Sequence, residues 1–150
     1  MRIVIQRVSE ASVFVSGAKL GAIGPGLLVL VGVGRDDTET DAAVLADKTV
    51  NLRIFADSDG KMNHSAKELK LPLLIISQFT LYADCTHGRR PYFGTAADPE
   101  LGERLYELFC ERVSQSGLEV QKGRFRSYMQ VQSVNDGPVT IILDSKSLLK

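Results

Sequence analysis

A Gly-Pro step near the C-terminus constrains how this chain can fold more than any other feature. It stands between two segments typical of strands, the alternating Tyr128–Val134 and the Val/Ile-rich Val139–Leu143. Asp136-Gly137 between such segments is a strong hairpin signal and predicts that the two strands pair with each other. A β-turn does not account for Pro138, because proline at the first position of an inner strand loses a hydrogen bond of the ladder.

The alternative is that the bond between Gly137 and Pro138 has a special conformation. An X–Pro bond is the one peptide bond that is cis at modest cost, and proline also fixes φ. A cis bond would point two successive carbonyl oxygens the same way and form a rigid pair of acceptors. The sequence leaves both interpretations open.

A second informative segment, Ser77–Leu81, directly follows the apolar run Leu73–Ile76. Pro72 begins the predicted strand Leu73–Phe79, where a missing N–H is tolerated. The polar side chains of Ser77, Gln78 and Thr80 either satisfy local backbone groups or, with the backbone N–H groups near Phe79 and Thr80, form an oxyanion site. No G-x-S-x-G motif is present, and nothing supports a Ser-His-Asp triad.

The other elements predict one α/β domain over residues 1–150. Thr38 and Asp98-Pro99 are typical helix starts, and Gly117 ends the second helix. Mixed, curved sheets, barrel-like or sandwich-like, would be flanked by these two main helices. Residues 144–150 are expected to be a frayed tail. Further strands are predicted at Arg2–Val8, Ser12–Val15, Lys19–Ile23, Leu27–Val33, Arg53–Ala56 and Val120–Lys122, and a turn at Asp57–Gly60.

Charge and cysteine usage limit the classes of partner. Eighteen basic and eighteen acidic residues cancel, so a nucleic acid would bind through a local patch only. Cys85 and Cys110 have no metal-ligand spacing, and two lone cysteines without a secretory segment indicate a cytoplasmic protein. Leu27–Val33 is too short to span a bilayer. We expect no metal, no cofactor, and neither a membrane nor a DNA partner.

Basic and aromatic residues alternate in two places. Basic residues of this kind more often form a solubilising surface than a nucleic-acid footprint, but the aromatic residues between them strengthen the case for binding of unpaired RNA. Aromatic rings stack on unpaired bases, while guanidinium groups bind phosphates. Arg7 stands apart, inside a Val/Ile-rich strand, where it either faces solvent or has specific partners. The RNA-contact candidates are Arg89, Arg90, Lys122, Arg124 and Arg126, and the aromatic residues between them are Tyr82, Tyr92, Phe93, Phe125 and Tyr128.

Several of these motifs, taken in chain order, resemble the D-aminoacyl-tRNA deacylase family of the bacterial and eukaryotic type. The resemblance extends over nearly the whole chain and includes several motifs of five or six residues. The segments that carry it are Ile5–Val8, Gly26–Gly34, Arg53–Phe55, Gly60–Asn63, Ser77–Leu81, Arg90-Pro91, Gly123–Phe125, Met129–Val131 and Asn135–Thr140.

The resemblance implies a homodimeric hydrolase that cleaves the ester between a D-amino acid and the terminal adenosine of tRNA. It also implies action on glycine misattached to alanine tRNA. Gly137 and Pro138, joined by a cis bond, would line the partner subunit's pocket and exclude L side chains, and Arg7 would hold them. The floor under the ester would be formed by Ser77, Gln78, Phe79 and Thr80, with Phe125 and Met129 nearby.

The chemistry of such an ester suggests a mechanism without a strong nucleophile. The neighbouring 2′-hydroxyl and the ammonium group already activate the carbonyl, so water would attack while N–H groups around Phe79 and Thr80 stabilise the oxyanion. Thr80 as a covalent nucleophile is the rival hypothesis, and it needs a base that the sequence does not identify. A non-catalytic RNA-end-binding module and a hydrolase of free D-amino-acid derivatives remain as alternatives.

Overall fold

The computed structural model describes residues 1–150, and its sheet is organised around one long strand, β1 (Arg2–Val15). The first half of β1 pairs antiparallel with β3 (Gly26–Gly32), and the second half pairs with β2 (Ala18–Ile23). The C-terminal strand β8 (Gln130–Asp144) runs antiparallel to β1 along almost its full length.

The sheet continues from β3 through parallel strands and curls back towards its beginning. β6 (Leu73–Ser77) pairs parallel with β3, and β7 (Val120–Lys122) pairs parallel with β6. β2 then meets β7: a Cβ on Gly21 would lie 3.2 Å from Oε1 of Gln121. The sheet is therefore mixed and almost closed, which confirms the expected barrel-like α/β fold.

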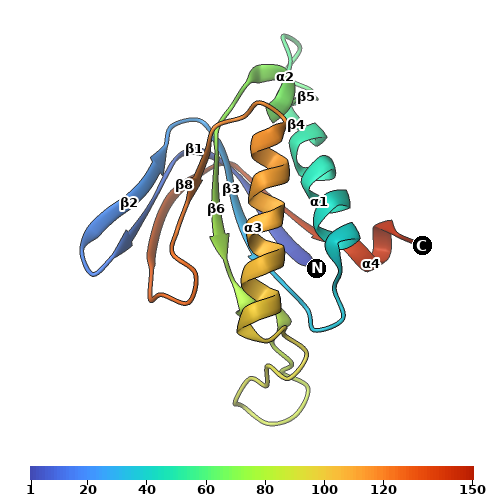
Figure 1. Ribbon diagram of the computed structural model, residues 1–150. Helices are drawn as coiled ribbons and strands as arrows, with labels where there is room; N and C mark the ends of the chain where they lie inside the picture. The colour runs from blue at the N-terminus through green and yellow to red at the C-terminus, as the bar shows by residue number, and fades with distance from the viewer.

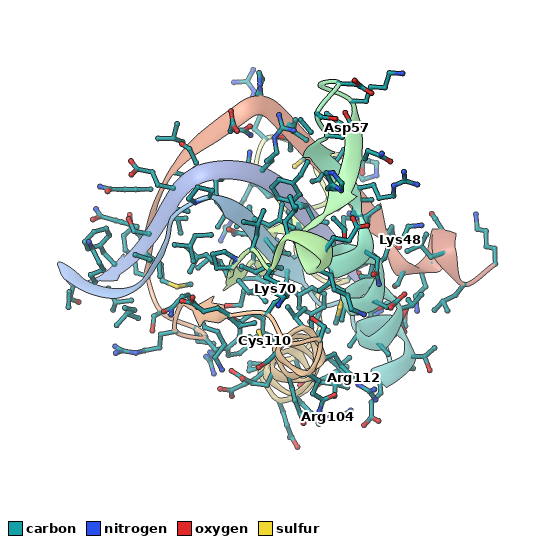
Figure 2. The ribbon with its side chains drawn as sticks, turned by 90° about the horizontal axis from the view of Figure 1, so that it is seen from above. Lys48, Asp57, Lys70, Arg104, Cys110 and Arg112 are labelled. Atoms are coloured by element: carbon teal, nitrogen blue, oxygen red, sulfur yellow. The ribbon has the colours of Figure 1, made fainter.

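Two helices cover one face of this sheet, as Figure 1 shows, with α3 (Pro99–Gln115) across β6 and α1 (Glu39–Asn51) beside it. The predicted caps begin both helices: Oδ2 of Asp41 accepts hydrogen bonds from the backbone and side chain of Thr38, and Asp98 accepts from the N–H of Leu101. Figure 2 shows α3 end-on, with Arg104 and Arg112 directed away from the sheet and Cys110 on the side that faces it. The core between helices and sheet includes Leu45, Leu73, Ile75, Leu105 and Phe109, all fully buried.

Short elements complete the fold. β4 (Arg53–Ala56) and β5 (Met62–Ser65) form a separate hairpin, followed by α2 (Ala66–Leu69). A 3₁₀ helix, η1 (Phe79–Tyr82), follows β6 after a single residue, and α4 (Ser145–Leu148) ends the chain. None of the helices is both long and apolar enough to cross a membrane.

The predicted hairpin at Asp136-Gly137 is wrong. β8 is one continuous strand, and both of its halves pair with β1 and not with each other. Gln6 pairs with Thr140 and Val8 with Asn135, so residues 136–139 form a wide bulge opposite Arg7. Both halves of β8 pair with the same neighbour, β1, so the local turn signal at Asp136-Gly137 produces a bulge and not a hairpin.

Three other predicted boundaries also differ. The two strands expected at Arg2–Val8 and Ser12–Val15 are the single strand β1, and the strand expected to reach Phe79 ends at Ser77, where the chain turns into η1. The tail expected to be frayed from residue 144 instead forms α4, because Ser145 is fully buried and its hydroxyl donates to Asp41 over 2.6 Å.

Candidate active site

A cavity of about 760 Å³ opens between the end of β6, the first turns of α3 and the loop 123–129. Hydrophobic residues form ten of its eighteen lining positions. Of the residues singled out in the sequence, the lining includes Ser77, Gln78, Phe79, Thr80, Phe125, Arg126, Tyr128 and Met129.

The turn from β6 into η1 leaves two backbone donors without acceptors at this cavity. The N–H of Gln78 donates to the carbonyl of Val31 over 2.7 Å, and that of Leu81 donates to Gln78 over 3.3 Å. The N–H groups of Phe79 and Thr80 between them are the first donors of a short helix and have no acceptor within it, and no turn, loop or side-chain group accepts from them. Two adjacent free N–H groups at a cavity are suited to binding an oxyanion.

Side chains of this segment are ordered by one another. The Gln78 amide donates to the hydroxyl oxygen of Thr80. The ring of Phe79 stands edge-on to that of Phe93, with centroids 5.0 Å apart. Neither histidine lines the cavity, and its one carboxylate, that of Asp98, accepts from the N–H of Leu101 at the helix cap.

The deep wall is aromatic and uncharged. The Tyr106 hydroxyl donates to the carbonyl of Ile75 over 2.8 Å, and its ring lies 6.1 Å from that of Phe125. Burial raises the pKa of Tyr106 well above its ordinary value, so this phenol stays neutral. Gly123 leaves room for Met129, because a Cβ at position 123 would collide with the methionine sulfur. The wall therefore offers packing and not acid–base chemistry.

The far end of η1 is clamped by Arg2, Asp37 and Asp144, none of which was predicted to act at the site. Arg2 donates through Nη1 to the carbonyl of Leu81 over 2.9 Å, pairs with Asp144 at 3.2 Å and lies 5.1 Å from the centre of the Tyr82 ring. The Tyr82 hydroxyl donates to Asp37 over 3.3 Å, and its pKa is raised by burial and by the charge of that carboxylate. These partners are far apart in the chain, so no local pattern connects them.

Beneath η1, the last residue of β3 and a residue just after this strand are glycines, at positions where side chains would not fit. A Cβ on Gly32 would lie 3.0 Å from the carbonyl oxygen of Gln78, and one on Gly34 would lie 2.9 Å from the ring of Tyr82. These contacts let the 3₁₀ helix lie close to the strand. Its position is fixed from below and from its far end.

Gly137 and Pro138 lie outside this cavity. The bond between them is cis, Gly137 has a φ of 146° that favours glycine, and both residues are exposed. Arg7 holds the bulge: Nε donates to the carbonyl of Asp136 over 2.8 Å, and Nη1 donates to that of Ile54 over 2.6 Å. The side chain of Asn135 accepts from the N–H of Val139 over 2.7 Å. Arg7 therefore has specific partners, and the alternative of a merely solvated side chain is wrong.

The basic candidates are dispersed. Arg126 lines the cavity, whereas Arg89, Arg90 and Arg124 are exposed away from its lining. Lys122 forms an ion pair with Glu107 at 2.6 Å, and that carboxylate raises the pKa of the lysine. Of the five predicted RNA-contact residues, Arg126 alone lines the cavity.

Comparison with known proteins identifies the family of this chain. The family model described as D-Tyr-tRNA(Tyr) deacylase matches residues 4–144. A Thermotoga petrophila protein named D-aminoacyl-tRNA deacylase is 57% identical over 148 residues, which cover 99% of each chain. A Bacillus cytotoxicus protein of the same name is 55% identical over 97% of this chain and 100% of its own length.

Solved structures agree on the fold. A c-Myc DNA unwinding element binding protein superposes with a TM-score of 0.90 at 39% identity, covering 96% of this chain and 98% of its own. A probable eukaryotic D-amino acid tRNA deacylase superposes with a TM-score of 0.80 over 95% and 97% of the two chains; at 18% identity, this likeness concerns the fold alone. By its family model and its relatives, the chain belongs to the D-aminoacyl-tRNA deacylases, hydrolases that act on the ester bond of aminoacyl-tRNA.

Proposed function

We propose that the cavity holds the aminoacyl ester of a D-aminoacyl-tRNA, with the carbonyl oxygen facing the N–H groups of Phe79 and Thr80. The observation that carries this proposal is that these two donors are free and adjacent at a cavity. One donor of this kind typically stabilises the transition state by about 3–4 kcal/mol. Ser77 and Gln78 complete the floor, and Phe125 and Met129 pack against the amino acid or the adenosine.

Water is the attacking group in this mechanism. The ester is reactive because the 2′-hydroxyl next to it and the ammonium group of the amino acid polarise the carbonyl. Water adds to the carbonyl carbon and gives up a proton, assisted by the 2′-hydroxyl, and the tetrahedral intermediate expels the ribose oxygen, which takes a proton. No histidine lines the cavity and its one carboxylate, that of Asp98, caps α3, which supports water over a threonine nucleophile. Thr80→Val should accordingly keep most of the rate, and a total loss would favour the covalent route.

Rejection of L-amino acids is assigned to a second copy of the chain. Gly137 and Pro138 are exposed, rigidly held by Arg7 and outside the lining of their own cavity. Delivered to the cavity of a second copy, they form a wall that clashes with the L side chain and spares the D arrangement. Exclusion discriminates mirror images better than attraction does, because the two substrates lose nearly the same hydration.

The same wall has a consequence for glycine. Glycine has no side chain to clash, so glycine misattached to alanine tRNA should be hydrolysed too. An aminoacyl-tRNA substrate also implies a tRNA-binding protein that acts in the cytoplasm. The wall donated by a second copy implies a homodimer.

DNA is not expected as a partner, although one structural relative is named for a DNA element. The net charge of zero gives this chain no general attraction for duplex phosphates. Duplex DNA is therefore a suitable competitor: it should not slow deacylation at physiological salt, whereas uncharged tRNA should.

The direct test incubates purified protein with D-tyrosyl-tRNA, L-tyrosyl-tRNA and glycyl-tRNA(Ala), and measures the released amino acid. The proposal expects release from the first and third substrates and none from the second. Binding of tRNA without release would favour the non-catalytic RNA-end-binding module. Equal activity on D-tyrosine methyl ester, insensitive to salt, would favour a hydrolase of free D-amino-acid derivatives.

A further inference from the structure

The loop between β7 and β8 contains an arginine in a conformation that favours glycine. Arg126 has a φ of 58°, in the left-handed region that is costly for residues with a Cβ. It lies in a tight turn, closed by the N–H of Ser127 donating to the carbonyl of Arg124 over 3.2 Å. The backbone alone would be better served by glycine, so the reason for an arginine is to be found in its side chain.

The guanidinium of Arg126 has no partner within the chain. The arginine ion pairs involve Arg2, Arg35 and Arg104, and no hydrogen bond is made by the Arg126 side chain. The residue nevertheless belongs to the cavity lining. An unpaired cation at a cavity mouth that also carries two free N–H donors indicates an anionic ligand.

Tyr128, two residues further on, is the most exposed of the large hydrophobic residues, at 90%. It lines the same cavity as Phe79, which is itself 58% exposed. An aromatic side chain left this bare gains nothing from packing within the fold. Its face is suited to stacking on a flat, unpaired ring.

We infer that Arg126 and Tyr128 form a subsite for the nucleotide that precedes the terminal adenosine. Arg126 would bind the phosphate between the two nucleotides, and Tyr128 would stack on the unpaired base. This inference rests on the proposed function, because it assumes that the cavity holds the terminal aminoacyl-adenosine. It adds that recognition extends one nucleotide further along the single-stranded end.

The test compares a substrate that has this nucleotide with one that lacks it. For each variant, kcat/KM is measured on D-tyrosyl-tRNA and on the D-tyrosyl ester of free adenosine, and the ratio of the two values is taken. Tyr128→Ala should lower the ratio by about 5- to 100-fold, the usual range for loss of one base–aromatic stack. Tyr128→Phe keeps the ring and should keep the ratio. Arg112→Ala removes a charge on the outer side of α3 (Figure 2) and is the matched control.

Arg126→Gly separates a binding role from a structural one. Glycine is favoured at this φ, so the variant should unfold at the same or a higher temperature than the wild type. Its ratio should fall, and the slope of log kcat/KM against log salt on the tRNA substrate should decrease by roughly 0.7, as expected for one lost phosphate contact. A lower melting temperature would overturn the inference, because Arg126 would then serve the fold.

Other outcomes separate this inference from the proposed function. A wild type that hydrolyses neither substrate contradicts the proposed function and the subsite together. Hydrolysis of both substrates, with ratios of Tyr128→Ala and Arg126→Gly within twofold of the wild type, contradicts the subsite alone. A change in elution volume of Tyr128→Ala on size exclusion would also overturn it, because the ring would then belong to a contact between copies.

Discussion

At the scale of single residues, the proposed catalysis relies on backbone groups more than on side chains. The two free N–H donors belong to Phe79 and Thr80, and neither is removed by an ordinary side-chain substitution. Proline is the exception, because it lacks the N–H and its fixed φ is compatible with the first position of a helix. Position 79 is that position in η1.

Phe79→Pro should therefore lower kcat by roughly 100- to 1000-fold relative to Phe79→Ala, the usual effect of losing one oxyanion donor. Both variants lack the phenyl ring, so their ratio isolates the N–H group. Single-turnover deacylation of D-tyrosyl-tRNA measures the effect, with the melting temperature of both variants as the control for folding. Equal rates for the two variants would show that this donor does not face the oxyanion.

At the scale of elements, η1 works as a platform that the rest of the fold holds in place. Arg2 reaches it from β1 and is itself paired with Asp144 at the end of β8. One side chain thus joins three segments that are distant in the sequence. The orientation of the free N–H groups depends on this clamp.

Arg2→Ala should reduce kcat by about 10- to 100-fold with little change in KM, since a small misplacement of catalytic groups affects the transition state most. Arg104→Ala is the matched control: it removes an exposed ion pair with Glu39 and should leave both constants near the wild type. Arg2→Lys keeps the charge but lacks the planar guanidinium that reaches both Leu81 and Asp144. Its kcat should therefore lie between those of Arg2→Ala and the wild type. A rise in KM alone would assign Arg2 to substrate binding instead.

Local sequence patterns predicted the elements whose structure is determined by residues close together in the chain. The caps at Thr38 and Asp98 and the apolar strand before Ser77 were predictable, and the segment Ser77–Thr80 with Phe125 and Met129 was expected together and does lie in one cavity. Their catalytic roles stay predictions. The features that were not predicted depend on residues far away in the chain. The bulge of β8, for example, depends on the pairing of this strand with β1.

The short helices were not predicted for a second reason. η1, α2 and α4 span four residues each, too few for hydrophobic periodicity to be recognised. α4 is fixed by the contact between Ser145 and Asp41, 104 residues apart in the chain. The clamp formed by Arg2 escaped in the same way, because its partner Leu81 is 79 residues away.

At the scale of the whole molecule, the two ends of the chain are tied to the same helix start. Ser145 donates its backbone N–H to the carbonyl of Met1 over 2.9 Å and its hydroxyl to Asp41, which lies in the first turn of α1. Figure 1 accordingly shows the N-terminus and α4 on the same side of the molecule. Burial alone would raise the pKa of Asp41, but hydrogen bonds from Ser145 and Thr38 outweigh it, and the pKa lies well below its ordinary value.

The sign of the resulting pH dependence follows from that lowered pKa. The stabilisation by the Asp41 carboxylate is fully present above its unfolded pKa of 3.8 and is lost as the pH falls below that value. Asp41→Asn should reduce the free energy of unfolding by about 1–3 kcal/mol at pH 7 and flatten its decline below pH 4. Asp59→Asn, in an exposed turn, is the control. Urea unfolding between pH 3 and 7 checks this, and parallel curves for wild type and Asp41→Asn would contradict it.

We propose that chirality is checked by a wall donated from a second copy. Mixed dimers test it most directly: Phe79→Pro disables one cavity but keeps its wall, while Pro138→Ala alters a wall but keeps its cavity. Dimers that contain one copy of each are isolated with two affinity tags, and hydrolysis of D- and L-tyrosyl-tRNA is measured. We predict that their single working cavity, facing the intact wall of its partner, rejects the L-substrate as the wild type does. Mixed dimers as unselective as Pro138→Ala alone would contradict the claim, because each wall would then serve its own cavity.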